Sequence, residues 1–293
     1  MPSDPVVVTS GVLRSWPLPA PGEDKEARGR TLIVGGSTST PGAVLLAAEA
    51  ALRCGAGKLQ VATVASLAPH LAVALPEALV RALPETASGG IDPSAAGAVL
   101  ELASDAAATL LGPGMIGIDD TVELVGRVLA EAPCSIVLDA LAVAVVEEGY
   151  PGLQGTAARA VLTPNNTELS MMLGVDRERV DRDVRGAVLE AARATSAVIT
   201  SGGAESWTAH PDGRSWRDES GGSGLGVSGS GDVHAGVVVG LAARGADPAQ
   251  AAVWGAHLHK RAGDRLAASV GKLGFLAREL PAEIPRVLAE IEV

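Results

Sequence analysis

The stretch "TLIVGGSTSTPGAVLLAAEAALRCGAGKLQVATV", Thr31 to Val64, holds the pattern that decides the fold. Two short apolar runs, 31–36 and 58–64, contain β-branched residues and have the length of buried strands. The Ala/Leu-rich segment between them has Pro41 near its start and Gly55 at its end, where proline and glycine are favoured in helices. Strand, helix and strand in this order predict two parallel strands joined by a crossover helix.

The same alternation continues along the chain. Strands are predicted at 108–114, 134–140, 159–164 and 196–203, and helices at 119–132, 165–174 and 178–194. From 205 a polar hairpin is predicted with its turn at Asp212-Gly213, and three helices follow near 232–244, 248–270 and 281–291. This order indicates the α/β fold class, with a mostly parallel central sheet flanked by helices. No repeat or long low-complexity linker interrupts the pattern, so we expect one domain over 1–293, with the leader 1–30 packed on it.

Composition excludes several classes of partner. The 23 Lys and Arg against 34 Asp and Glu give a net charge of -11, which opposes the long-range attraction that nucleic acid binding needs. No apolar stretch approaches the ~20 residues that span a bilayer, and no signal peptide is evident. We therefore expect no nucleic acid partner, no membrane partner and a cytoplasmic location. Cys54 and Cys134 lie in apolar surroundings, which predicts buried free thiols.

Glycine-rich or polar segments follow the predicted strands repeatedly, at 34–43, 111–114, 163–168 and 200–203. A fifth such segment, 227–232, opens the late helix. Ligands of parallel α/β sheets bind at the carboxyl ends of the strands, so these loops are where a site is expected. Each loop alone could simply end a strand, because glycine also serves in turns. Five loops at one sheet edge favour a ligand cleft.

The sharpest of these loops opens "GVSGSGDVHAGVVVGLAARG", Gly226 to Gly245. Gly229, Ser230 and Gly231 can turn successive backbone N–H groups toward one point, and a helix expected to start at about Asp232 adds its positive dipole end. This predicts an anion hole for a nucleotide phosphate. The Asp232 carboxylate beside it is placed to act as a general base on a hydroxyl that accepts phosphate. The alternative is that Asp232 only caps the helix.

Three further groups carry weaker signals. Asn165 and Glu168 are spaced to lie on one face of a helix start, where Glu168 could hold Mg²⁺ through water. The same spacing also fits a capping box with no metal role. His257 and His259 are two apart on a predicted helix and so face different ways, which argues against a metal pair. His234 lies near the loop and is expected to pack or to face solvent.

These motifs resemble the ribokinase-like superfamily and, within it, the ADP/ATP-dependent NAD(P)H-hydrate dehydratases. The resemblance covers nearly the whole chain, from the segment 13–37 to the segment 279–288. It is most specific in 35–63, 111–115, 161–169 and 228–245. It implies a three-layer sandwich, frequent homo-oligomers, Mg²⁺, and ADP or ATP as phosphoryl donor. The implied reaction phosphorylates the ring hydroxyl of hydrated NADH or NADPH and then eliminates phosphate, which restores the double bond.

The resemblance also implies roles for single residues. Asp232 matches the acid that activates the hydroxyl and contacts the substrate, and Gly231 before it matches a nucleotide-binding glycine. Ala43 matches a position that contacts the hydrated cofactor. One glycine of "GPGMIG", Gly114 or Gly117, matches another position that contacts the hydrated cofactor.

Two segments depart from the family pattern. "TSGGAES" stands where the family shows Lys-Gly-x-x-Thr, with Ser201 in place of the Lys and Gly202 kept. The nucleotide-binding residues expected from it and from the late loop are Ser201, Gly202, Gly203, Ala204, Glu205, Gly229, Ser230 and Gly231. Asn165, expected to bind substrate, replaces a His, so that "TPNNTE" is similar to a segment of small-molecule kinases in the superfamily. In "LDALAV", Leu141 replaces the second acid of the family's Asp-Ala-Asp segment.

Three hypotheses of function follow. The first is nucleotide-dependent dehydration of hydrated NADH or NADPH, favoured by the N-terminal third and by the loop at 229–232. The second is a kinase of a small alcohol or vitamin precursor, favoured by Asn165 and Glu168. The third is a non-catalytic nucleotide-binding paralogue, favoured by the missing Lys and Thr in 201–205.

Overall fold

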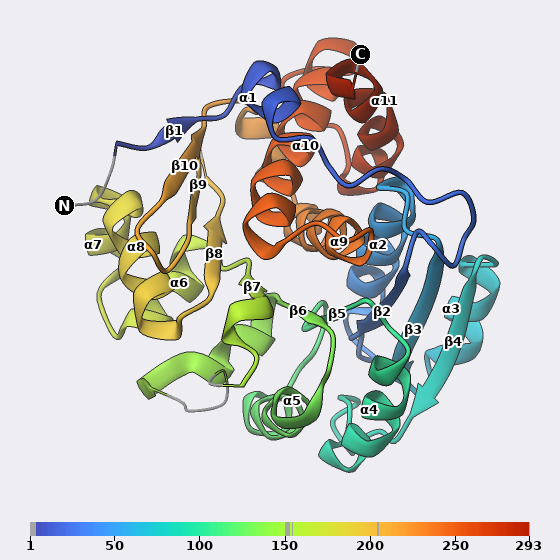
Figure 1. Ribbon diagram of the computed structural model, residues 1–293. Helices are drawn as coiled ribbons and strands as arrows, with labels where there is room; N and C mark the ends of the chain where they lie inside the picture. The colour runs from blue at the N-terminus through green and yellow to red at the C-terminus, as the bar shows by residue number, and fades with distance from the viewer. Residues whose placement is uncertain (1–3, 150–152, 154, 204, 293) are drawn as a thin grey trace.

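A single large sheet forms the middle layer of the computed structural model, which describes residues 4–149, 153, 155–203 and 205–292. Within these residues the sheet has ten strands in the order β1-β10-β9-β8-β7-β6-β5-β2-β3-β4 (Figure 1). The strands are β1 (Val6–Val7), β2 (Arg30–Val34), β3 (Lys58–Val64), β4 (Ala78–Leu83), β5 (Ala108–Leu111), β6 (Ser135–Leu138), β7 (Ala160–Leu162), β8 (Val198–Ser201), β9 (Ser206–Ala209) and β10 (Ser215–Asp218).

Most neighbouring strands are parallel. β2 lies between β3 and β5, with Thr31 opposite Leu59 on one side and Ala108 on the other. Only β9 runs antiparallel to its two neighbours, β8 and β10. The α/β class with a mostly parallel sheet is therefore confirmed.

Helices cover both faces of the sheet because the central strands are apolar on both sides. In β2, Ile33 packs into one core, and Leu32 and Val34 pack into the other. The first core is covered by α2 (Pro41–Arg53), α9 (Ser230–Ala243), α10 (Pro248–Ser269) and α11 (Leu280–Glu292). The second is covered by α4 (Ala96–Ser104), α5 (Ile118–Glu131), α6 (Asn166–Leu173) and α8 (Val184–Thr195) (Figure 1). This is the expected ribokinase-like three-layer sandwich.

Several elements differ from the sequence-based prediction. The pattern missed β1 and β4 and the helices α1 (Ser10–Ser15), α3 (Ala68–Ala74) and α4. The predicted helix 178–194 is wrong as one element: it divides into α7 (Arg177–Arg182) and α8 at Asp183. Asp183 leaves the helical conformation, and its side chain accepts a hydrogen bond from the Gly186 amide, so it caps α8. Both cysteines are buried and free, as predicted.

The carboxyl ends of the parallel strands place the candidate loops together. Because β2, β5, β6, β7 and β8 run in the same direction, the loops that follow them lie at one edge of the sheet. The described residues also include five short 3-10 helices: η1 (Pro93–Ala95), η2 (Ala140–Gly149), η4 (Ala157–Arg159), η5 (Ser223–Leu225) and η6 (Ala277–Glu279).

Candidate active site

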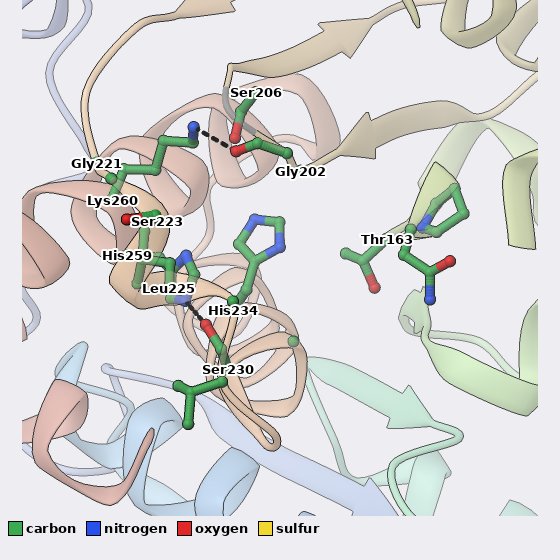
Figure 2. Close-up of a pocket in the computed structure, with 17 residues that line it drawn as sticks. Thr163, Gly202, Ser206, Gly221, Ser223, Leu225, Ser230, His234, His259 and Lys260 are labelled. Atoms are coloured by element: carbon green, nitrogen blue, oxygen red, sulfur yellow. Dashed lines mark hydrogen bonds between the residues drawn. The ribbon is translucent and has the colours of Figure 1, made fainter. Parts of the chain in front are cut away.

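A cavity of about 620 Å³ opens at this edge of the sheet. Its walls come from the loop after β7, the loop after β8, the segment that leads into α9, and α10 (Figure 2). They are formed by Thr163, Pro164, Asn165, Gly202, Gly203, Ser206, Gly221, Gly222, Ser223, Leu225, Gly226, Val227, Ser230, Gly231, His234, His259 and Lys260. A volume of this size lies within the range of sites for small molecules and cofactors.

The N-terminus of α9 forms one end of the cavity. The helix begins at Ser230, two residues before the predicted start, because Gly229 at the N-cap has φ of 89°. A Cβ atom on Gly229 would lie 2.5 Å from Leu46 Cδ1, so the turn requires glycine. Among the hydrogen bonds between described residues, the amides of Gly231 and Asp232 have no acceptor. These donors and the helix dipole are what the predicted anion hole requires, and phosphate binding at this place stays a prediction.

Asp232 lies in the first turn of α9 and does not cap it. The N-cap is Gly229, and no side chain caps the helix. Burial, and then the charge of Glu168, raise the pKa of Asp232 to about 6. A carboxyl with this pKa is largely ionised at neutral pH and can still take up a proton, which suits a general base. The geometry therefore disfavours the capping alternative.

Asp232 belongs to a group of three carboxyls. Asp139, at the end of β6, and Glu168, in the first turn of α6, act on one another and on Asp232 electrostatically. Asp139 is buried, and Thr163 Oγ1 lies 2.6 Å from its Oδ1. Burial raises the pKa of Asp139 well above its usual range, and the two neighbouring carboxyls act in the same direction. Asp139 was not among the predicted site residues, although it begins the "DAL" remnant of the family's Asp-Ala-Asp segment.

Asn165 and Glu168 form a capping box at the start of α6. The Asn165 side chain accepts hydrogen bonds from the amides of Thr167 and Glu168 at 2.8 and 3.0 Å, and Glu168 Oε2 accepts one from the Asn165 amide at 2.9 Å. The capping alternative is thus observed directly. Asn165 nevertheless lines the cavity. No group of three metal-ligating side chains occurs in the part of the chain that the structure describes.

The loops after β2 and β5 contact each other at the two positions that the resemblance assigns to the hydrated cofactor. A Cβ atom on Gly114 would lie 2.9 Å from Ala43 Cβ, and Thr40 Oγ1 donates a hydrogen bond to Gly114 O at 2.7 Å. Gly117 instead forms the exposed N-cap of α5. Of the two glycines that the sequence left open, Gly114 is the one that the structure places against Ala43.

The predicted nucleotide segment after β8 divides into two parts. Gly202 and Gly203 line the cavity. Ser201 is fully buried, and its Oγ donates to Asn166 Oδ1 at 3.3 Å, away from the cavity wall. Glu205 pairs with Arg217, whose Nε lies 2.9 Å from Glu205 Oε2. Ala204 lies outside the described residues.

Among the cavity residues that the sequence did not predict as binding residues, three have basic side chains, namely Lys260, His259 and His234. Lys260 Nζ donates a hydrogen bond to Gly203 O at 3.0 Å, and His259 Nε2 lies 2.9 Å from Ser230 Oγ (Figure 2). His234 packs against His259 with ring centroids 5.3 Å apart, and burial lowers the pKa of His234 to about 4. His257 faces away and bonds Asp218 at 2.7 Å, as expected for two histidines that form no metal pair.

The chain is similar to known proteins over most of its length. The profile of the NAD(P)H-hydrate dehydratase family matches residues 31–286. The chain is 47% identical over 283 residues to the ADP-dependent (S)-NAD(P)H-hydrate dehydratase of Xanthomonas campestris pv. campestris, a match that covers 96% of this chain and 95% of that protein. It is 35% identical to the bifunctional NAD(P)H-hydrate repair enzyme of Moorella thermoacetica over 90% of this chain and 50% of that enzyme, so it spans about half of that relative.

A solved structure gives the same result for the fold. The ADP/ATP-dependent NAD(P)H-hydrate dehydratase of Bacillus subtilis, co-crystallised with ATP and Mg²⁺, matches 99% of both chains with a TM-score of 0.81 and 27% identity. The family profile and the Xanthomonas relative each cover most of the chain. The chain belongs to the NAD(P)H-hydrate dehydratase family.

Proposed function

We propose that the protein uses ADP or ATP to dehydrate hydrated NADH and NADPH and thereby restores the reduced cofactors. One observation carries this proposal: the first turn of α9 holds two amides without an acceptor beside the Asp232 carboxyl. The nucleotide cavity lies on one side of this turn, and the names of the relatives identify the chemistry.

The reaction begins with phosphoryl transfer. Asp232 takes the proton of the ring hydroxyl while the hydroxyl oxygen bonds to the terminal phosphorus of the nucleotide. The bond from that phosphorus to the remaining AMP or ADP breaks. The free amides of Gly231 and Asp232 and the dipole of α9 stabilise the negative charge on the transferred group.

The second half is an elimination. The C–O bond of the phosphate ester breaks, and its electron pair leaves with inorganic phosphate. The neighbouring ring carbon loses a proton to water, and the electron pair of that C–H bond forms the ring double bond. Ala43 and Gly114 present small, closely packed surfaces, and we propose that the nicotinamide ring is bound there together with Asn165.

Magnesium is the metal that we propose for the nucleotide. Bound Mg²⁺ neutralises phosphate charge, and it keeps much of its water shell at sites with one or two carboxylates. Glu168 fits such a role through a water molecule. Its carboxyl accepts a hydrogen bond from the Asn165 amide, and its charge raises the pKa of Asp232. No cage of three protein ligands occurs among the described residues, so the nucleotide phosphates would supply the direct ligands.

The decisive experiment is a spectroscopic assay with hydrated NADH or NADPH, Mg²⁺ and either ADP or ATP. We expect the absorbance band of the reduced nicotinamide ring to return. Asp232→Asn should lower turnover by ~10²–10⁴-fold, the usual contribution of a general base, while nucleotide binding survives. No recovery with either nucleotide, while a related dehydratase recovers the band in parallel, would contradict the proposal.

Product analysis separates the other two hypotheses. A stable phosphorylated product seen by mass spectrometry would favour a kinase of a small alcohol, to which the Asn165–Glu168 segment is similar. Nucleotide binding without turnover, unchanged in Asp232→Asn, would favour a non-catalytic binding protein.

We further propose a cytoplasmic location and a homo-oligomeric state. Reduced nicotinamide cofactors and adenine nucleotides are used together in the cytoplasm, and the family resemblance implies association of identical chains. In the described part of the chain, no helix combines the length and apolar character that a membrane crossing requires. Sedimentation analysis measures the oligomeric state, and a single species with the 29.3 kDa mass of one chain would contradict it.

A further inference from the structure

The proposed function does not say which groups neutralise the charge of a nucleotide bound in the 620 Å³ cavity, here called the nucleotide cavity. ADP and ATP carry several negative charges, and the cavity lies beside the carboxyls of Asp232 and Glu168 in a chain of net charge -11. The N-terminus of α9 offers only about half a positive charge. Among the described residues that line the cavity, Lys260 is the only lysine or arginine.

Lys260 is a buried residue held in a defined place. It is 3% exposed, and its Nζ donates to Gly203 O at 3.0 Å, so the ammonium reaches from α10 across to the loop after β8. The preceding residue, His259, contacts Ser230 in the first turn of α9. The same turn of α10 therefore connects the anion hole with the loop after β8 (Figure 2).

Burial of this ammonium is costly. It lowers the pKa of Lys260, and the carboxylates of Asp218, Glu205 and Asp264 oppose this effect only partly. An apolar side chain of similar volume is often as stable as a buried charge or more so, and a phosphate is a ligand that would use the charge.

We propose that Lys260 binds the phosphate groups of the adenine nucleotide, in the place of the lysine that the family resemblance expects at Ser201. The proposal rests on the proposed nucleotide-dependent function. Ser201 itself faces Asn166, whereas the ammonium of Lys260 lies against the same loop two residues further on. The cation thus comes from α10 instead of from the end of β8.

The test measures binding of ADP and adenosine to the purified protein by calorimetry. Lys260→Met should weaken ADP binding roughly 10- to 100-fold, the usual range for a hydrogen bond to a charged group, and should change adenosine binding less than about twofold. The thermal midpoint of the unliganded variant should be equal to that of the wild type or higher. Lys25→Met is the matched control, because Lys25 is exposed and outside the cavity wall.

Two outcomes would overturn the proposal. ADP binding equal to wild type means that the ammonium does not contact phosphate. Parallel loss of ADP and adenosine binding assigns Lys260 to the shape of the cavity or to folding. Because binding is measured without turnover, failure of the dehydratase assay in the wild type leaves this result intact, so the two proposals can fail separately.

Discussion

Asp232, the proposed general base, works against the stability of the fold. Its carboxyl is partly buried next to Glu168, and these surroundings raise its pKa to about 6. The sequence predicted the residue and its role as a base, because a carboxylate after "GSG" is a local signal. It could not predict the pKa, because Glu168 lies on a different helix.

Asp232→Asn should stabilise the unliganded protein in a pH-dependent way. The pKa of Asp232 in the folded state lies above the ordinary 3.8, so the folded state is more stable with this carboxyl protonated. The stability of the wild type is therefore fully present below about pH 4 and falls as the pH rises through about 6. The variant should therefore be more stable than wild type by about 2 to 3 kcal/mol at pH 8, and equally stable at pH 4. Urea unfolding at both pH values measures the difference. An equal difference at the two pH values would contradict the assigned pKa.

Gly231→Val should weaken nucleotide binding without unfolding the protein. A Cβ atom on Gly231 meets nothing within 4 Å, and Gly231 lines the cavity next to the amides that have no acceptor. We expect ADP affinity to fall more than about tenfold, while the free energy of unfolding changes by less than about 1 kcal/mol. Gly97→Val is the matched control, since Gly97 is exposed at the same second position of α4. Unchanged ADP binding in Gly231→Val would remove this glycine from the site.

At the scale of helices, the packing of α9 against α2 sets the position of the candidate site. A Cβ atom on Gly236 would lie 2.3 Å from Ala47 O, and one on Gly240 would lie 2.7 Å from Ala51 O. The two helix backbones therefore approach each other closely through two glycines one turn apart. The sequence predicted a helix near 232–244, but the partner helix was decided by tertiary packing.

Gly236→Ala should destabilise the protein although alanine is the better helix former. The new methyl group meets the backbone of Ala47, which cannot move without shifting α2, and overpacking of this kind costs about 1 to 3 kcal/mol. Gly97→Ala meets nothing within 4 Å and should gain up to about 1 kcal/mol. Chemical denaturation of both variants gives the comparison. Effects of the same sign would show that propensity outweighs packing at Gly236.

The N-terminal leader bears on the stability of the whole molecule. Leu13 of α1 is fully buried, and Trp16 stacks on Trp216 of β10 with ring centroids 5.8 Å apart. Trp254 and Gln250 of α10 donate hydrogen bonds to the Trp16 carbonyl at 3.0 and 3.2 Å. These contacts join the start of the chain to the sheet edge and to α10, and they support the proposal that the leader and the remaining chain form one domain.

Leu13→Ala should therefore weaken the entire fold. Truncation of a fully buried leucine usually costs about 2 to 5 kcal/mol, and the unfolding transition should remain single if the leader belongs to the same cooperative unit. Val73→Ala, at a side chain that is 84% exposed, should change stability by less than about 0.5 kcal/mol. Two separate transitions in the wild type, with only one of them shifted by Leu13→Ala, would contradict the single domain.

Local patterns in the sequence determined the fold class and the best-defined part of the site. Short β-branched runs, the proline and glycine at helix ends, and the glycines before Asp232 act over a few residues, so they can be recognised without the fold. The five converging loops followed from them, because parallel strands bring their carboxyl ends to one edge.

Only the tertiary structure decided which distant residues complete the site. It placed Gly114 rather than Gly117 against Ala43. It also brought Lys260 to a carbonyl 57 positions away and His259 to a hydroxyl 29 positions away. Such contacts depend on how α10 packs across the sheet edge, and no local pattern in the sequence encodes that packing. The physical reason is that backbone preferences act between near neighbours, whereas the cavity is made by helices that meet through buried side chains.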